Sequence, residues 1–288
     1  MGKDATGGMA LPTLRDGVLT RRAVLALIGD AAITAGLGGC SGSEPEPAAS
    51  EDVGGDEAEA PNTPVTVVEH AAPAHESEFA QLLRAGELRS IRLIGDSITA
   101  GYECDGYGAT SDVLIYDGPY GAFLESADTV ACWANDFREF AQENGVGEFV
   151  NAGVSGAKMR WLAEDAQAWV REGADAIFVM LGTNDSVYYT EDEYRSDAEV
   201  GLSAAAEACQ HLVVMSPPRN AWRDYDPLYG ADTLEAVLAD LAQAHGWEFV
   251  SMKDSIQLGT DDFNEDQCHP SSKGSHAMWD YLRAALGL

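Results

Sequence analysis

Hydrophobic and polar residues alternate in blocks along residues 76–288, and these blocks predict strands and helices in turn. Five short apolar runs are bounded by glycine, proline or polar residues, which is typical of buried strands. These runs are residues 90–95, 148–153, 176–182, 211–217 and 247–252. Because each run is followed by a helix-like stretch, the strands are expected to lie parallel.

Helical spacing is visible between the predicted strands. Trp133, Phe137, Phe140 and Ala141 recur at the i, i+4, i+7 and i+8 positions of one helix face. The same spacing then recurs in a second set, made of Leu162, Ala166, Trp169 and Val170. Further along, a T-x-x-E capping box at Thr190 and Glu193 predicts the start of a helix that continues towards Ala208. The fold class is therefore α/β, a three-layer α/β/α sandwich around a central parallel sheet of about five strands.

Polar clusters follow the first three predicted strands and precede the last helix. They read "GDS" ending at Ser97, "NAGVSG" containing Gly153, "GTND" containing Asn184, and "NEDQCHPSSKG". Ligands of such sheets bind beyond the carboxyl ends of the strands, so these clusters are expected to converge. The last cluster places Asp266 three residues before His269. A serine, a histidine and an orienting carboxylate are the groups that acyl transfer needs.

The four clusters "GDSITAG", "NAGVSG", "GTND" and "DQCHP" resemble, in order and spacing, the four sequence blocks of the SGNH hydrolases, also called the GDSL lipase and esterase family. The resemblance covers about 210 residues, and "SPPR" at 216–219 adds a smaller match. It implies a flavodoxin-like fold and ester hydrolysis by a carboxylic ester hydrolase that uses neither a metal ion nor an organic cofactor.

The resemblance also implies a role for each matching residue. Ser97 would be the nucleophile, His269 its general base, and Asp266 the carboxylate that orients the imidazole. The backbone N–H groups of Ser97 and Gly153 and the side chain of Asn184 would form the oxyanion hole. A competing nucleophile is Ser155, because "GVSGA" differs by one residue from the G-x-S-x-G elbow of the α/β-hydrolases.

The predicted reaction is hydrolysis of short acyl esters, including acetyl groups on carbohydrates, through an acyl-Ser97 intermediate. A lysophospholipase or thioesterase using the same residues is an alternative, and so is a non-catalytic glycan-binding lipoprotein. Aromatic side chains on the loops are candidate substrate contacts, although half-buried packing is their commoner role. These candidates are Trp161, Tyr188 and Trp222.

The first 75 residues predict export rather than folding. Arg21 and Arg22 precede a short apolar run ending in "LGGC", which resembles a twin-arginine signal and the lipobox of bacterial lipoproteins. We therefore expect a signal peptide over residues 1–39, lipid attachment to Cys40, and an acidic linker without a packed core over residues 40–75. The catalytic domain would occupy residues 76–288. The protein would be anchored to the outer face of the cytoplasmic membrane by its lipid alone, or be secreted.

Composition adds two expectations. The formal net charge is −31, with 48 acidic and 17 basic residues, which argues against binding of nucleic acid. Cys104, Cys132, Cys209 and Cys268 follow the predicted lipidation site, and an even number in an exported protein is compatible with disulfides. Four cysteines allow three pairings, and the preferred one joins Cys104 to Cys132, which would close the long, irregular stretch between them. For Cys268, a bridge to Cys209 and a redox-sensitive free thiol are the alternatives.

Overall fold

A computed structural model of the protein describes residues 76–223 and 225–288. The predictions for the signal peptide, the lipidated Cys40 and the linker lie outside the described residues. Among the helices that the structure describes, none combines the length and the hydrophobicity needed to cross a bilayer.

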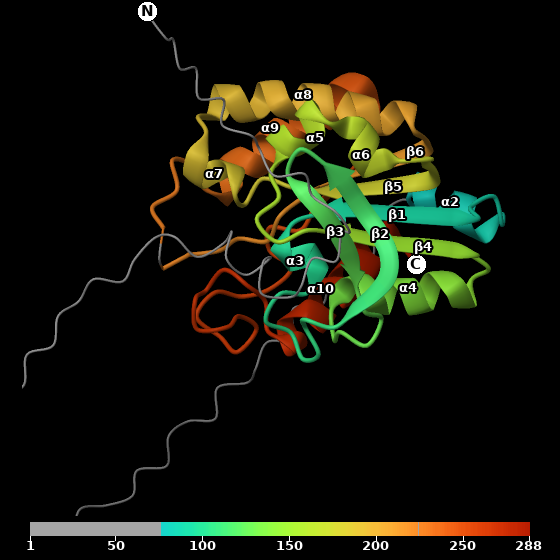
Figure 1. The fold of residues 1–288 in the computed structure, drawn as a ribbon, viewed down its shortest axis with the longest axis horizontal. Coiled ribbons are helices and arrows are strands. Elements are labelled where there is room, and N and C mark those ends of the chain that lie inside the picture. Colours follow the sequence, from blue (N-terminus) through green and yellow to red (C-terminus); the bar gives the residue numbers. More distant parts are fainter. Residues whose placement is uncertain (1–75, 224) are drawn as a thin grey trace, which may run out of the picture. The chain divides into compact units, whose positions relative to one another are not determined.

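Five parallel strands form the central sheet, in the order β4-β1-β5-β6-β7 (Figure 1). They are β1 (Ser90–Gly95), β4 (Glu148–Gly153), β5 (Ala174–Met180), β6 (Cys209–Ser216) and β7 (Glu248–Ser251). All neighbouring pairs are parallel, and Gly95 is in register with both Gly153 and Met180. The predicted five-stranded parallel sheet is confirmed, and the carboxyl ends of β4, β1 and β5 lie level with one another.

Helices cover both faces of this sheet (Figure 1). One face carries α2 (Glu78–Arg84), α4 (Trp133–Glu143) and α10 (Ser272–Leu286), and the other carries α5 (Met159–Glu164), α6 (Ala166–Val170), α8 (Glu191–Glu207) and α9 (Ala231–His245). Successive residues of a strand point to opposite faces. Leu93 accordingly packs in the core of the first face, and its neighbour Ile94 packs in the core of the second. This arrangement confirms the three-layer sandwich.

Two of the predicted helices form as expected and one does not. Trp133, Phe137 and Ala141 are buried along α4, and the capping box of Thr190 and Glu193 opens α8 with both of its hydrogen bonds. The spacing over residues 162–170 predicts one helix, but the segment forms two, α5 and α6. The chain leaves the helical conformation at Asp165, where φ is −146° and ψ is 56°.

The stretch between Cys104 and Cys132 was predicted to be irregular, and this is wrong. Residues 110–126 form an antiparallel hairpin of β2 (Thr110–Gly118) and β3 (Gly121–Ser126). Buried charged groups attach the hairpin to the main sheet. Arg92 of β1 donates to the carbonyl oxygen of Ile115 on β2 at 2.8 Å, and Glu125 of β3 accepts from the backbone N–H of Asn151 on β4 at 2.7 Å.

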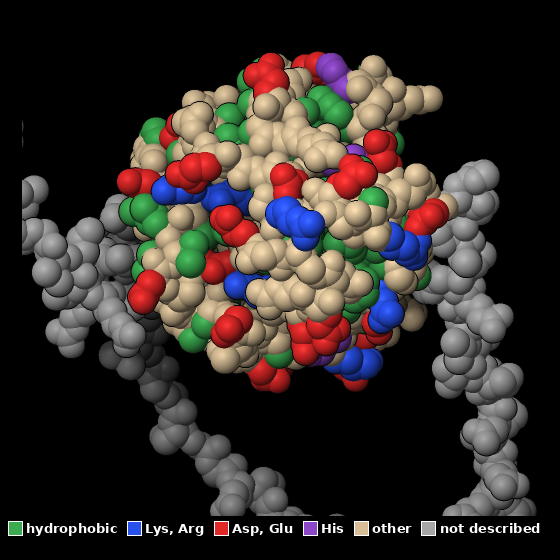
Figure 2. All heavy atoms as spheres, turned by 90° about the vertical axis from the view of Figure 1, so that its right-hand side faces the viewer, with side chains coloured by type: hydrophobic (Ala, Val, Ile, Leu, Met, Phe, Trp, Pro, Cys, Tyr) green, Lys and Arg blue, Asp and Glu red, His purple; other side chains and the backbone are tan. Residues whose placement is uncertain are grey.

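Charge of both signs is present on the surface at the amino ends of the strands. Figure 2 shows this face, with basic side chains interspersed among acidic ones. An ion pair between two exposed side chains contributes little to stability, because water screens the two charges. The fold therefore depends on its apolar layers and on the few buried charges.

Candidate active site

The polar clusters converge at the carboxyl ends of the central strands. In chain order the strands of the sheet lie 2-1-3-4-5, so the path of the chain reverses between β1 and β5. Ligands of open α/β sheets bind at such a reversal point. The short helix α3 (Ser97–Ala100) begins directly after β1 and places Ser97 at this point.

Ser97, His269 and Asp266 form a continuous chain of hydrogen bonds. The Oγ atom of Ser97 lies 2.9 Å from Nε2 of His269, and Nδ1 of His269 lies 2.5 Å from Oδ2 of Asp266. With Asp266 ionised, Nδ1 carries the ring proton and Nε2 is free to accept the hydroxyl proton of Ser97. The arrangement can therefore raise the nucleophilicity of Ser97.

A tight turn allows Asp266 and His269 to share one short loop. Gln267 adopts a left-handed conformation with φ of 57°. This turn directs the backbone N–H groups of Cys268 and His269 at Oδ1 of Asp266, both at 3.0 Å. Although burial raises the pKa of Asp266, these hydrogen bonds and the His269 ring outweigh it and hold the pKa below its ordinary value. The carboxylate therefore stays ionised and orients the imidazole.

Gly153 lies where no larger residue fits. A Cβ atom at this position would come within 2.4 Å of the backbone nitrogen of Ala100 in α3. The N–H of Gly153 donates to Oδ1 of Asn151 at 3.0 Å, while Nδ2 of Asn151 donates to the carbonyl oxygen of Thr99 at 2.9 Å. Asn151 thus joins β4 to the helix that carries Ser97, a role that sequence reasoning missed. The N–H of Gly153 is engaged inside the protein, and it could only share its hydrogen with an oxyanion.

The other two predicted oxyanion donors, the Asn184 side chain and the Ser97 backbone N–H, each have a hydrogen available to donate. Asn184 is buried at the end of β5, and its Nδ2 donates to the carbonyl oxygen of Ala157 at 3.0 Å. This bond fixes the amide and uses one of its two hydrogens. The backbone N–H of Ser97 has no acceptor among the described residues.

Two further buried acids hold the elements that carry the site residues. Asp96 caps α3 by accepting from the N–H of Ile98 at 2.9 Å, and burial raises its pKa from 3.8 to about 7. Asp185 accepts from the N–H of Met159 at 2.9 Å, and burial raises its pKa from 3.8 to about 6. Both acids are adjacent to predicted site residues, Ser97 and Asn184, and this position could have identified them. The hydrophobic pattern alone does not show that they are buried.

Of the candidate substrate contacts, the structure brings Trp222 to the triad. Its ring centre lies 6.0 Å from that of His269. Tyr102, which sequence reasoning missed, lies closer, at 4.5 Å. Trp161 and Tyr188 instead flank the ammonium group of Lys158, whose Nζ lies 5.1 Å and 4.7 Å from their ring centres.

The competing serine has no histidine partner. Ser155 is exposed, and its Oγ lies 2.9 Å from the hydroxyl of Tyr107. The hydrogen-bonded chain that an activated serine needs is therefore seen at Ser97 and not at Ser155 among the described residues.

The expected disulfide is wrong, because all four described cysteines are free thiols. Cys104 directs its thiol to the carbonyl oxygen of Pro270 at 3.7 Å, and Cys132 is buried beside Gly101. Burial raises the pKa of Cys104 to about 12, and it raises the pKa of Cys268, next to His269, even further. These thiols are therefore protonated, packed side chains.

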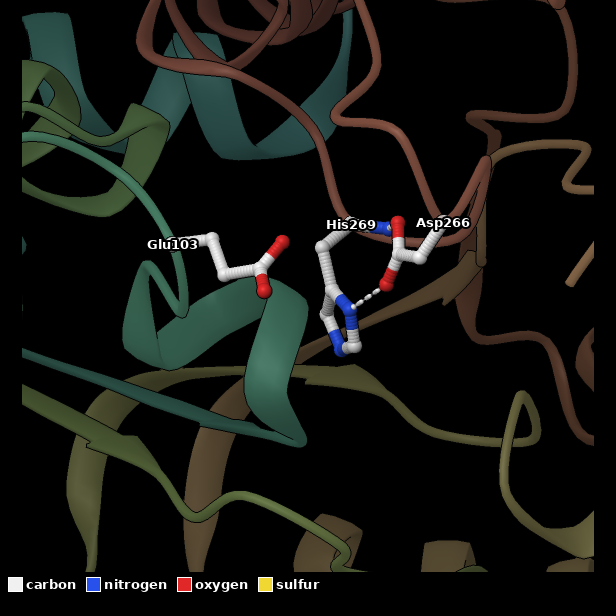
Figure 3. A group of neighbouring side chains, drawn as sticks. All are labelled: Glu103, Asp266 and His269. Carbon is white, nitrogen blue, oxygen red and sulfur yellow. Dashed lines mark hydrogen bonds and ion pairs between the residues drawn. The ribbon is translucent and has the colours of Figure 1, made fainter. Parts of the chain in front are cut away.

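One further acid lies next to the triad. Glu103, Asp266 and His269 have side-chain oxygen and nitrogen atoms within 4.8 Å of one another, and Figure 3 shows Glu103 pointing toward the imidazole from the segment after α3. The ring nitrogens of His269 are already hydrogen-bonded to Asp266 and Ser97. Glu103 is thus a neighbour of the triad that the motifs did not indicate.

Comparisons with known proteins agree with this fold and identify the family. An α/β hydrolase from the metagenome of Lake Arreo, Spain, matches with a TM-score of 0.53 and 20% identity, over 69% of this chain and 95% of that one. An acetylxylan esterase from Geobacillus stearothermophilus matches with a TM-score of 0.51 and 19% identity, over 69% and 94%. At these identities the likeness concerns the fold.

No curated protein matches the sequence. The model of the GDSL-like lipase/acylhydrolase family matches residues 93–277, which include every member of the triad, and the chain therefore belongs to this family of carboxylic ester hydrolases.

Proposed function

We propose that the protein is a serine esterase that removes short acyl groups, including acetyl groups on carbohydrates, through an acyl-Ser97 intermediate. The observation that carries the proposal is the hydrogen-bonded chain from Ser97 Oγ through His269 to Asp266. The acetylxylan esterase activity named for the similar Geobacillus stearothermophilus structure supports acetyl esters of carbohydrates as the substrate class.

In the first half-reaction, Ser97 Oγ attacks the ester carbonyl carbon while its proton passes to Nε2 of His269. The carbonyl oxygen becomes an oxyanion that the Ser97 N–H and the Asn184 amide stabilise, with the N–H of Gly153 contributing if it shares its bond to Asn151. Nε2 then returns the proton to the leaving alcohol oxygen as the carbon–oxygen bond breaks. Asp266 stabilises the imidazolium throughout.

In the second half-reaction, water takes the place of the alcohol. His269 accepts a proton from the water as its oxygen attacks the acyl carbon, and it then protonates Ser97 Oγ as the ester bond to the enzyme breaks. The carboxylic acid leaves, and the triad is restored. Neither half-reaction requires a metal ion or a cofactor, in keeping with the implied family chemistry.

The predicted lipidation of Cys40 would place this activity at the outer face of the cytoplasmic membrane. In that setting the acidic linker would hold the catalytic domain away from the lipid surface and towards extracellular esters. The proposal for the site does not depend on this location.

The test is a substrate series with the full chain. Hydrolysis of p-nitrophenyl esters of increasing acyl length, acetylated xylo-oligosaccharide, lysophosphatidylcholine and an acyl thioester is measured as kcat/KM. We expect the highest values for acetyl esters, with acetylated oligosaccharide preferred over the lipid and the thioester. Mass spectrometry of acid-quenched enzyme should find the acyl group on the peptide that contains Ser97. A preference for long-chain lipid esters would overturn the substrate assignment, and the absence of any ester hydrolysis by folded protein would overturn the function.

A further inference from the structure

The carboxylate of Glu103 is a negative charge beside the triad that the reaction itself does not use. Its side chain is exposed, and it comes within 4.8 Å of the polar atoms of Asp266 and His269 (Figure 3). Within the described part of the chain it forms no ion pair and no hydrogen bond. A carboxylate held next to a reaction centre without a partner is available to a ligand.

The backbone at Glu103 supports a role for its side chain. Glu103 has φ of 63°, in the left-handed region where glycine is favoured and other residues are strained. The turn is held by the backbone N–H of Cys104, which donates to the carbonyl oxygen of Gly101 at 3.0 Å. Strain of this kind clusters at functional sites, and here it sets the direction in which the Glu103 side chain leaves the backbone.

Aromatic rings also lie next to His269. The ring centres of Tyr102 and Trp222 lie 4.5 Å and 6.0 Å from that of His269. Tyr107 packs against Tyr102, and Tyr225 packs against Trp222. All four rings are exposed or half-buried. The faces of tyrosine and tryptophan rings are electronegative and attract ammonium groups, and a nearby carboxylate strengthens that attraction.

Because Glu103 and these rings lie beside His269, they would contact the leaving-group part of a substrate. Nε2 of His269 must reach the leaving oxygen of the ester to protonate it, so groups that flank this ring lie on the leaving-group side. Lys158, the basic side chain of the Gly153 loop, is engaged elsewhere: its ammonium donates to the carbonyl oxygen of Gly156 at 3.2 Å and lies over Trp161 and Tyr188.

The net negative charge of the whole domain also favours the binding of cations. Residues 76–288 contain 37 acidic and 13 basic side chains, a formal charge of −24. A field of this sign concentrates cations near the surface and repels anions.

We propose that Glu103, with the rings of Tyr102 and Trp222, forms a subsite for a positively charged leaving group, so that the enzyme prefers esters of ammonium-bearing alcohols and discriminates against anionic esters. This inference rests on the proposed esterase function. It assigns Glu103 as a specificity-determining residue and leaves the chemistry of Ser97, His269 and Asp266 unchanged.

Three acetate esters of similar shape test the proposal with the full chain. Acetylcholine is cationic, 3,3-dimethylbutyl acetate is its neutral counterpart, and the acetate ester of 2-hydroxyethanesulfonate is anionic. In the wild-type protein we expect kcat/KM for the cationic ester to exceed that for the neutral ester by about tenfold, the size of one cation–π contact combined with a partly screened charge. The anionic ester should be slowest, and added salt should compress the order.

Glu103→Gln should bring the cationic-to-neutral ratio close to one, and Glu103→Lys should invert it. The matched control is Glu172→Gln, which removes the same charge from a side chain that is 88% exposed at the amino end of β5. This control should keep the wild-type ratio. Because ratios within one variant are compared, a general loss of active protein does not affect the result.

An inhibition experiment on the wild-type protein works without any variant. Choline should inhibit hydrolysis of p-nitrophenyl acetate at a concentration about tenfold lower than 3,3-dimethylbutanol does. Equal inhibition by the two alcohols, or equal ratios in wild type and Glu103→Gln, would overturn the inference while leaving ester hydrolysis intact. If Glu103→Gln slowed a neutral sugar acetate as much as acetylcholine, Glu103 would be an acceptor for hydroxyl groups, and the cation subsite would be rejected. Failure of folded wild-type protein to hydrolyse any ester would instead count against the proposed function.

Discussion

The Oγ atom of Ser97 and Nε2 of His269 lie 2.9 Å apart, although 172 positions separate the two residues in sequence. This contact exists only because β1 ends at the same edge of the sheet as the loop that precedes α10. If Ser97 is the nucleophile, Ser97→Ala should lower kcat for p-nitrophenyl acetate by at least about a thousandfold, because the covalent route is lost. Single-turnover measurements would separate this loss from weaker binding.

Ser155→Ala is the matched control for Ser97→Ala. Its hydroxyl contacts Tyr107 and no histidine, so kcat should change by less than about threefold. The reverse result, with activity kept in Ser97→Ala and lost in Ser155→Ala, would move the nucleophile to the other serine.

Asn184→Ala should remove an oxyanion donor without removing the nucleophile. The expected effect is a decrease in kcat of about 10²- to 10³-fold with little change in KM, because the amide acts on charge that develops in the transition state. Asn144→Ala is a suitable control, since Asn144 is exposed at the end of α4 and its side-chain amide donates to the carbonyl oxygen of Phe140, away from the triad. A rise in KM with unchanged kcat would assign Asn184 to ground-state binding instead.

The strands and the order of the motifs could be predicted because they depend on local pattern. A run such as residues 90–95 is mostly apolar and short, ends at Gly95 and is followed by Asp96, and these features alone predict a strand that ends at a polar loop. Parallel strands then bring their carboxyl ends together, so the meeting of Ser97 and His269 follows from topology.

The hairpin could not be predicted because its reasons lie in distant residues, and Glu103 could not because its reason is a backbone conformation without a sequence pattern. Strands β2 and β3 are held by Arg92 and by Glu125, whose partners belong to other parts of the chain. A buried charge has no recognisable sequence pattern until its partner is known. Glu103, likewise, gains its place from a strained turn rather than from any periodicity.

Glu125→Ala should destabilise the attachment of the hairpin. Oε1 of this buried carboxylate pairs with Arg138 at 2.5 Å and accepts from the N–H of Asn151 at 2.7 Å. Removing one member of a buried pair leaves the other charge without compensation, at a cost of about 3–5 kcal/mol in the free energy of unfolding. Urea unfolding followed by tryptophan fluorescence measures the change.

Asp240→Asn provides the contrast for Glu125→Ala. Asp240 pairs with Arg195 at 3.0 Å, but both side chains are exposed, so the loss should be no more than about 1 kcal/mol. Equal effects of the two substitutions would show that the hairpin carboxylate is not a buried anchor.

Asp96→Asn should change how stability depends on pH. Burial raises the pKa of Asp96 from 3.8 to about 7, so between these values the folded state binds a proton more tightly than the unfolded state does. The stabilisation from this proton is complete below about pH 4 and is lost as the pH rises through about 7. Asparagine is a good helix N-cap that can still accept from the N–H of Ile98, and it does not titrate.

The free energy of unfolding of Asp96→Asn, relative to that of the wild type, should therefore increase from pH 4 to pH 7. Since one pKa unit corresponds to about 1.4 kcal/mol, the increase over this range should approach about 4 kcal/mol. Urea unfolding at several pH values measures this difference, and subtracting the two proteins cancels the titration of carboxyl groups that do not interact with Asp96. A difference that is constant with pH would mean that Asp96 is already ionised in the folded protein near pH 4, and a difference that decreases would mean that its folded-state pKa is lowered rather than raised.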